Sequence, residues 1–236
     1  IDPESTDKNR AGVLIGTGVG GMHTIDKNLR VANTKNFSRV SPFFIPHILT
    51  NMPGAIVAIE HGFKGPNYSI STACATSNHC LLAAKRHIEY GDCDIMIAGG
   101  VEAAVNAPSF GGFSALHALS RNFKNPSSAS KPFDKTRDGF VMGEGAGIFI
   151  LESEEHALKR GAKIYAEISG GSVNSDAHHM TNPLSDGSEV ARCIKEAIES
   201  AGLVPDDIDY INAHATSTPI GDICELRAIK TVFGKN

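Results

Sequence analysis

The stretch PNYSISTACATSNHC, residues 66–80, places Cys74 between two different local patterns. Residues 68–73 alternate in the manner of a short strand that enters a core. From residue 81 to 88 apolar side chains recur at helical spacing until Gly91, so we expect a helix of about four turns that begins near Ala75. The sequence therefore predicts a cysteine at the point where a strand gives way to a helix.

This position suits a nucleophile. The first backbone N–H groups of a helix lack intrahelical partners, and they favour negative charge. A thiol there ionises more readily, and the thiolate is its nucleophilic form. The small residues Ala73, Ala75 and Ser77 leave room for another molecule to approach. On these residues alone, the alternative of a small buried hydrophobic cysteine in a tight turn remains equally open.

Four stretches resemble motifs of one enzyme family, the β-ketoacyl-acyl-carrier-protein synthases, which are the condensing enzymes of type II fatty acid synthesis. STACATSN, residues 71–78, resembles the nucleophile motif, and NAHATSTP, residues 212–219, resembles the first catalytic histidine motif. SPFFIP, residues 41–46, and RDGFVMGEGAG, residues 137–147, match as well. The resemblance covers nearly the whole chain. It implies a thiolase-like α/β fold, layered α-β-α-β-α with two related halves, and here incomplete at both ends.

The resemblance also implies an activity. The parent enzyme would be an acyltransferase that elongates fatty acids by two carbons through decarboxylative Claisen condensation. Cys74 would hold the acyl group as a thioester, and His214 would donate a hydrogen bond to the malonyl thioester carbonyl. Within the same fold, the alternative activity is a polyketide-type ketosynthase. An alternative of a different class is a non-catalytic module that binds acyl-carrier protein, and the presence of both Cys74 and His214 argues against it.

Further positions match residues that the family uses around its substrates: Val19, Phe44, Phe113, Thr181, Thr216, Thr218 and Glu225. By resemblance the three threonines would bind the pantetheine arm, and Val19 and Phe113 would line the acyl pocket. Phe44 would reach into the partner's pocket across the two-fold axis of a homodimer. Glu225 would support the site by pairing with a lysine. From their spacing alone, Asp222 and Glu225 could equally form a solvated helix face.

The resemblance implies no cofactor, because the malonyl and acyl thioesters arrive on the phosphopantetheine arm of acyl-carrier protein. It also implies no metal. The adjacent His178 and His179 invite a metal interpretation, but neighbouring side chains point apart on regular structure. His117 stands where bacterial relatives usually carry an arginine that contacts the carrier protein. The family's second histidine and its lysine would lie outside this chain, so the segment by itself is expected to be inactive.

The composition of the chain argues against several other classes of protein. The chain has 236 residues, 41% of them hydrophobic, and a net charge of −4, which argues against a nucleic-acid binder. No apolar run approaches the roughly 20 residues that a membrane span requires. Five cysteines, an odd number without a CxxC pair, favour a reducing interior. We therefore expect a cytoplasmic protein, or a protein of the plastid stroma in a plastid-bearing organism.

The remaining patterns predict the order of the elements. We expect strands at residues 11–16, 94–98, 164–170 and 208–213, and a buried strand that ends near residue 151. We expect helices at residues 47–61, 152–161 and 189–202, and a helical turn at 115–120. Residues 28–37 read as irregular, 99–102 and 110–113 as turns, and 122–135 as a surface loop. We place a boundary at about residue 160, with the nucleophile in residues 1–160 and the first catalytic histidine in 161–236.

Overall fold

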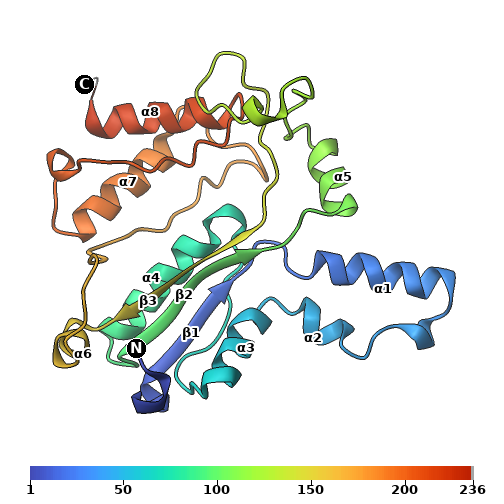
Figure 1. Cartoon of the computed structure of the whole chain (residues 1–236). Helices are drawn as coiled ribbons and strands as arrows, with labels where there is room; N and C mark the ends of the chain where they lie inside the picture. The colour runs from blue at the N-terminus through green and yellow to red at the C-terminus, as the bar shows by residue number, and fades with distance from the viewer. Residues whose placement is uncertain (235–236) are drawn as a thin grey trace. The chain divides into compact units, whose positions relative to one another are not determined.

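The computed structural model describes residues 1–234, and it has the mixed α/β structure that the sequence predicts (Figure 1). The chain divides into two units. The first contains Ile1–Ser109 and Gly143–Ile168, and the second contains Phe110–Met142 and the residues from Ser169 onward. The expectation of two related halves that meet near residue 160 stays a prediction.

A three-stranded sheet forms the centre of the first unit (Figure 1). Its strands, in spatial order, are β1 (Ala11–Gly16), β2 (Ile95–Glu102) and β3 (Gly145–Glu152). Strands β1 and β2 are parallel, with Ala11 opposite Ile95, whereas β2 and β3 are antiparallel. Since β2 pairs on both sides, it is the inner strand of the sheet.

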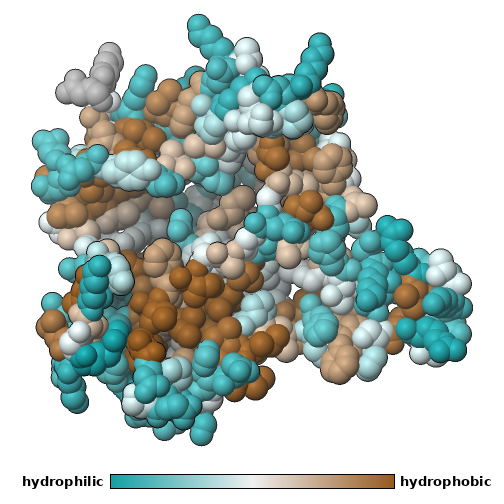
Figure 2. Space-filling view, in the orientation of Figure 1, coloured by the Kyte–Doolittle hydropathy of each residue, from teal (hydrophilic) through white to brown (hydrophobic). Residues whose placement is uncertain are grey.

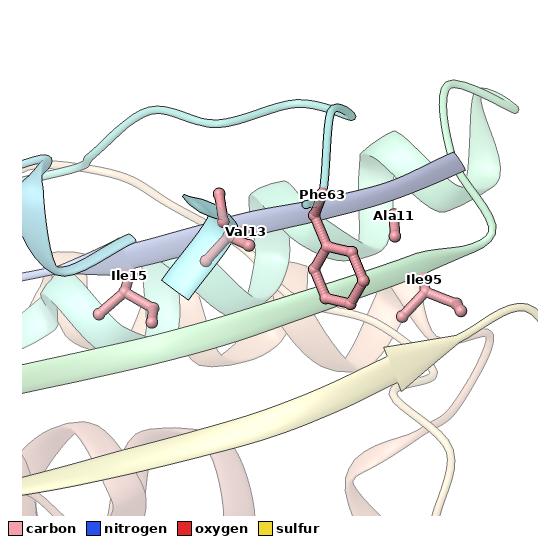
Figure 3. Close-up of a cluster of buried hydrophobic side chains, with 6 residues drawn as sticks. Ala11, Val13, Ile15, Phe63 and Ile95 are labelled. Atoms are coloured by element: carbon pink, nitrogen blue, oxygen red, sulfur yellow. The ribbon is translucent and has the colours of Figure 1, made fainter. Parts of the chain in front are cut away.

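Strand β1 is buried along its whole length, and its successive side chains point to opposite faces of the sheet. Figure 3 shows one cluster, in which Val13 and Ile15 of β1 lie with Phe63 and Ile95. Leu14 belongs to the other cluster, where it meets side chains of β2 and of the helix α4 (Thr76–Glu89). The helix α3 (Met52–His61) contributes Ala58 to the first cluster. Helix α4 is thus fixed to the sheet by its apolar side chains.

The helix expected after Cys74 is confirmed, since α4 covers 14 residues and Gly91 follows it with a φ of +77°. The strand expected at residues 68–73 is wrong. This segment joins β1 only through one bridge, between Val13 and Asn67, and then runs close beside it. The approach is tight enough that a Cβ at Gly16 would lie 2.4 Å from the Ile70 carbonyl oxygen. The segment therefore packs against β1 without a regular ladder.

The turn expected at residues 99–102 is also wrong, because these residues continue β2. Glycines suggested a turn, but here they permit close packing between strands. A Cβ on Gly99 would lie 2.0 Å from the carbonyl oxygen of Gly147 on β3. The glycine lets the two backbones pass at this point, and the strand continues to Glu102.

Two expectations about the region before α3 fail. Residues 22–34 form a helix, α1 (Met22–Thr34), although the part from residue 28 read as irregular. It is a polar helix whose surface carries an ion pair between Asp26 and Arg30 at 2.9 Å. The single helix expected at residues 47–61 is two, α2 (Phe44–Ile48) and α3, because Pro53 begins a new helix in its first turn.

The strand expected to be buried near residue 151 forms as β3, but its burial was predicted wrongly. Phe149 and Ile150 are 59% and 57% exposed. Figure 2 shows hydrophobic side chains gathered over this part of the sheet. The reason is that β3 is an edge strand, paired only with β2 among the described residues. The expected helix that follows is confirmed as α6 (Glu154–Lys159).

A helix, α5 (Ala107–Ala115), replaces the turn expected at residues 110–113 and ends at the first residue of the helical turn expected at 115–120. The Asn106 side chain accepts a hydrogen bond from the Ser109 N–H at 3.0 Å and so caps its start. Beyond it, residues 122–135 form the expected loop.

In the second unit, α7 (Ser188–Ser200) confirms the expected amphipathic helix and packs on α8 (Gly221–Phe233). The strands expected at residues 164–170 and 208–213 do not form. A strand exists only by pairing with a neighbour, and neither segment has a ladder partner within residues 1–234. Short 3₁₀ turns occur at Pro3–Ser5, Lys8–Arg10, Phe37–Arg39, Ala73–Ala75, Pro126–Ser128 and Pro205–Asp207. Within residues 1–234, every helix is too short or too polar to cross a membrane.

Candidate active site

Cys74 lies in the short turn Ala73–Ala75 that leads directly into α4, and its side chain is exposed. The turn is held by the buried Thr76. Its hydroxyl accepts a hydrogen bond from the Thr72 N–H at 2.9 Å and donates one to the Ala73 carbonyl at 2.7 Å. Ala73 has a φ of +51°, which is unusual for a residue with a side chain. The thiol is therefore presented by a constrained turn at the start of a helix.

The glycine-rich loop after β1 packs against this turn. The Ser71 hydroxyl donates a hydrogen bond to the Gly18 carbonyl at 3.1 Å. A Cβ on Gly18 would lie 3.4 Å from the Ala73 carbonyl oxygen, so the two backbones are in close contact. Next to them, the Thr72 hydroxyl and His79 Nδ1 are 2.8 Å apart. The loop thus borders the segment that carries Cys74.

Glu102 holds the same loop from the other side, a role that the sequence did not suggest. One carboxylate oxygen accepts a hydrogen bond from the Thr17 hydroxyl at 3.1 Å. The other accepts from the N–H groups of Gly18 and Val19 at 3.0 and 3.1 Å. The only signal in the sequence is an acidic residue at the end of an apolar, glycine-rich strand.

A cavity of about 700 Å³ lies within the first unit, beside the loop. Its lining includes Thr17, Met22, Met52, Ile56, Val101 and Glu102. Most of these side chains are apolar, as in a pocket that receives a hydrophobic ligand. Val19, which was expected to line an acyl pocket, is half-exposed next to this lining rather than part of it. Phe44 begins α2 and is half-buried.

His214 lies in the second unit, where Glu225 of α8 holds its backbone. The Glu225 carboxylate accepts hydrogen bonds from the N–H groups of His214 and Ala215 at 2.6 and 2.8 Å. Ala215 and Ser217 have φ values of +45° and +66°, so the chain after the histidine is tightly bent. The imidazole is exposed on this bend. The partners seen for Glu225 are backbone groups, and its expected pairing with a lysine stays a prediction.

Thr216 and Thr218 belong to a network next to His214. Their hydroxyl oxygens are 2.9 Å apart, and Thr218 Oγ1 also accepts a hydrogen bond from the Gly221 N–H at 3.1 Å. Asp222 anchors the network, and it accepts from the Phe133 N–H at 2.8 Å. The alternative of a solvated face is wrong for Asp222, because this side chain is completely buried.

The other expected site residues in the second unit lie on loops or helix ends. Phe113 packs edge-on against Phe140, with ring centroids 5.3 Å apart. Thr181 is exposed, and its N–H donates to His179 Nδ1 at 3.1 Å. His117 Nδ1 lies 2.9 Å from the guanidinium of Arg121, so a positive charge stands beside the position where the resemblance expects an arginine.

The other cysteines differ from Cys74. Cys80, Cys93 and Cys224 are buried, and burial raises the pKa of each thiol, for Cys93 to about 11. Their burial indicates that these three cysteines serve in packing. Within residues 1–234 there is no group of three or more metal-ligating side chains close enough to hold an ion.

The structure brings Cys74 together with the loop that contains Val19 in the first unit. In the second unit it brings His214 together with Thr216, Thr218 and Glu225. Phe44 belongs to the first unit, and Phe113 and Thr181 belong to the second. Cys74 and His214 lie in different units, and their joint action stays a prediction.

Comparison with models of known protein families shows to which family the chain belongs. Residues 1–157 match the model of the β-ketoacyl synthase N-terminal domain, and residues 165–236 match that of the C-terminal domain. The chain belongs to the β-ketoacyl synthase family. The resemblance read from the nucleophile and histidine motifs is thereby confirmed at the level of the family.

Individual β-ketoacyl synthases support this assignment. The chain is 56% identical to the chloroplastic 3-oxoacyl-[acyl-carrier-protein] synthase I of Arabidopsis thaliana, over 96% of this chain and 48% of that protein. It is 47% identical to 3-oxoacyl-[acyl-carrier-protein] synthase 2 of Coxiella burnetii, over 99% of this chain and 56% of that protein. The chain thus spans about half the length of these relatives.

Solved structures agree on the fold. A type II polyketide ketosynthase, solved with its acyl-carrier protein and bound to a hexaketide, superposes with a TM-score of 0.94 at 38% identity. The match covers 100% of this chain and 59% of that one. A β-ketoacyl synthase from Burkholderia phymatum gives a TM-score of 0.89 at 35% identity, over 98% of this chain and 56% of that one. The expected thiolase-like α/β fold is confirmed.

Proposed function

We propose that the full-length protein containing this chain is a 3-oxoacyl-[acyl-carrier-protein] synthase that elongates fatty acyl groups by two carbons. One combined observation carries the proposal. The chain shares 56% identity with a synthase of that name, and it presents Cys74 as an exposed thiol in the turn that begins α4. A non-catalytic carrier-binding module would need neither this cysteine nor His214.

The first step is acyl transfer to Cys74. The thiolate attacks the carbonyl of an acyl thioester on the carrier's phosphopantetheine arm, the carrier thiolate leaves and takes up a proton, and an acyl-Cys74 thioester forms. The start of α4 supports this step, because the positive end of the helix dipole stabilises a thiolate and then an oxyanion. The tight turn held by Thr76 keeps the sulfur in place during both events.

The second step is condensation. The malonyl thioester loses its carboxylate as carbon dioxide, and the electron pair of the broken C–C bond forms an enolate. His214 donates a hydrogen bond to the thioester oxygen where the negative charge develops. The enolate carbon then attacks the acyl carbonyl, and the Cys74 thiolate is released. No cofactor enters this scheme, because the thioester itself activates each carbonyl.

Two features of the second unit support the role of His214. Glu225 fixes the backbone on both sides of its Cα through two charge-assisted hydrogen bonds, which leaves the imidazole oriented by the bend. Thr216 and Thr218 place two hydroxyl groups immediately after it, where a pantetheine amide could be bound. A catalytic donor must be positioned before the reaction begins, and this arrangement provides that positioning.

Acyl-carrier protein is the proposed partner. Its acidic surface needs a positive contact, and Arg121 beside His117 supplies one in the second unit. Arg121→Gln should therefore raise the KM for carrier-bound substrate, while the KM for a small thioester that lacks the carrier should stay unchanged.

Homodimerisation is proposed for the first unit. The residues before and within α2 and α3 leave several large apolar side chains exposed, namely Phe43, Ile45, Leu49, Ile56 and Ile59. An apolar surface of this kind suits a subunit interface, and Phe44 lies among these residues. Ile59→Glu, at a position that is 78% exposed and outside the cavity lining, should shift the full-length protein towards monomer in sedimentation experiments.

The plastid stroma is the proposed compartment, since a chloroplastic synthase is 56% identical, with the cytoplasm as the alternative. Fluorescence microscopy of the full-length protein with a C-terminal tag tests this. A cytoplasmic signal would favour the second compartment.

A polyketide-type ketosynthase is the second candidate, because such an enzyme superposes along the whole chain. Its sequence identity of 38% is lower than the 56% shared with the fatty acid synthase relative. Product analysis separates the two. With acyl and malonyl carrier-protein thioesters, the full-length protein should release one 3-oxoacyl product longer by two carbons. Repeated extension without reduction would instead indicate the polyketide activity, and no acyl enzyme at all would refute both.

A further inference from the structure

We propose that Glu102 is a positioning residue that fixes the glycine-rich loop between Cys74 and the cavity, and thereby sets the acyl-chain selectivity of the enzyme. The proposal deepens the function proposed above and rests on it. Its basis is a set of contacts within the first unit alone.

Glu102 makes three hydrogen bonds to three consecutive residues of the loop. Its two oxygens accept from the Thr17 hydroxyl and from the N–H groups of Gly18 and Val19, all between 3.0 and 3.1 Å. A carboxylate that accepts backbone N–H groups makes stronger hydrogen bonds than a neutral acceptor. The loop has no regular secondary structure, so these bonds largely determine its backbone path.

The loop touches the nucleophile turn on its other side. The Gly18 carbonyl accepts the Ser71 hydroxyl at 3.1 Å, three residues before Cys74, and Gly18 approaches the Ala73 backbone closely. A shift of Gly18 would therefore be transmitted to the turn, or would open a gap beside it. Glu102, the loop and the turn form one connected sequence of contacts.

The loop also borders the cavity. Thr17 and Gly20 line it, and Glu102 reaches it from the end of β2. Glu102 directs both oxygens to the loop, and the rest of the lining combines apolar side chains such as Met52 and Ile56 with polar ones that include His23, His47 and Glu144. The loop contacts the Cys74 turn on one side and lines the cavity on the other, so in this proposal an acyl chain on Cys74 extends along the loop into the cavity. The position of the loop thus decides which chains fit.

Glu102 has a parallel in the second unit, where Glu225 accepts two consecutive N–H groups at His214 and Ala215. In both units a glutamate holds the backbone of a loop by accepting hydrogen bonds from two consecutive N–H groups. This repeated arrangement supports a positioning role for Glu102.

The experiment uses the full-length protein with Glu102→Ala and Glu102→Gln. In the alanine variant, amide hydrogen exchange at Gly18 and Val19 should accelerate at least about tenfold, because their acceptor is removed. The ratio of kcat/KM values for Cys74 acylation with long and short acyl donors should change at least about tenfold in the same variant. The Glu102→Gln variant should show the wild-type exchange rates and the wild-type selectivity ratio. Its side-chain oxygen accepts from the N–H groups of Gly18 and Val19, and its amide can donate to Thr17.

Two further variants complete the test. Thr17→Val removes one of the three bonds at similar volume, and it should shift both measurements in the same direction by a smaller factor, even if Glu102→Ala does not fold. Glu144→Gln changes a second acidic residue of the cavity, one that accepts from the Val105 N–H instead, and it should leave exchange at Gly18 and Val19 unchanged.

The outcomes are distinct. Unchanged exchange in Glu102→Ala would overturn the anchoring role, and faster exchange with unchanged selectivity would overturn the selectivity role. If wild-type protein never acylates Cys74, the proposed function fails and the selectivity role fails with it. The exchange measurement would still decide whether Glu102 anchors the loop.

Discussion

Arg137 Nε lies 3.2 Å from Asp222 Oδ2, and the two side chains are 9% and 0% exposed. Arg137 also donates to the carbonyl oxygens of Thr218 and Pro219 at 2.9 and 2.6 Å. The pair therefore connects the start of α8 with the bend that follows His214. Removing one partner would leave the other charge buried and unpaired.

We predict that Asp222→Ala lowers the free energy of unfolding by roughly 3–5 kcal/mol, the usual effect of breaking a buried ion pair. Urea denaturation followed by circular dichroism measures this. The matched control is Glu196→Ala, which breaks an exposed pair with Arg192 and should leave the denaturation midpoint nearly unchanged. Equal midpoints for both variants would show that the buried pair is dispensable.

The cysteines should react in a fixed order. Cys74 is exposed at a helix start, whereas the pKa of about 11 at Cys93 leaves only about one thousandth of that thiol ionised at pH 8. Iodoacetamide should therefore modify Cys74 first, and an acyl thioester should form on Cys74 alone. Peptide mass spectrometry locates both groups, with Cys74→Ala as the control. Acylation of Cys80 or Cys93 would contradict the assignment.

His214→Ala should reduce condensation by roughly 100- to 10,000-fold, as expected when a positioned hydrogen-bond donor is lost. Acylation of Cys74 should fall much less, because that step depends on the start of α4. Single-turnover assays with each substrate separate the two steps. His61→Ala, at the end of α3, controls for general effects of removing an imidazole. An unimpaired condensation rate in His214→Ala would mean that this histidine is structural.

The stabilising effect of the Glu152–Arg160 ion pair at the end of β3 should decrease at acidic pH. Arg160 donates to Glu152 at 2.6 and 2.7 Å, and these hydrogen bonds lower the pKa of Glu152 below its usual value of about 4.3. A carboxyl group with a lowered folded-state pKa stabilises the fold above its unfolded pKa and loses that contribution as the pH falls through the folded value.

Arg160→Gln should consequently be less stable than wild type at pH 7, and the difference should shrink as the pH falls below about 4. Urea titrations at several pH values and constant ionic strength measure it. A difference that stays constant down to pH 3 would mean that Arg160 acts through packing and not through its charge.

Local sequence patterns correctly predicted the elements that have a clear apolar periodicity and a clear end signal. The helices α4 and α7 carry clear apolar periodicity and end at glycines, and both form near the expected residues. The failures occur where a distant partner decides. Gly99 looks like a turn residue, but it lies within a strand because β3 passes close beside it. Whether an edge strand such as β3 is buried depends on neighbouring segments, and these cannot be predicted from the residues of the strand itself.

The candidate site was predictable to a similar degree. Cys74 and His214 stand in motifs that a single sequence displays, and the motifs led to the family. Glu102 was missed because its role exists only through contacts with a loop 83 to 85 residues earlier in the chain. The sequence left open whether Asp222 faces solvent for the same reason, since its partner Arg137 is also remote in sequence.

The left-handed backbone at Ala73 limits which residues natural variation or a mutant library can place next to the nucleophile. Its φ of +51° disfavours any residue with a Cβ by roughly 1–2 kcal/mol, and branched side chains suffer most. Glycine should be tolerated there, whereas valine and isoleucine should be eliminated under selection for folding. Ala215, which follows His214 and has a φ of +45°, is subject to the same conformational restriction. The set of amino acids tolerated at Ala73 and Ala215 is thus limited by backbone conformation, independently of what the reaction requires.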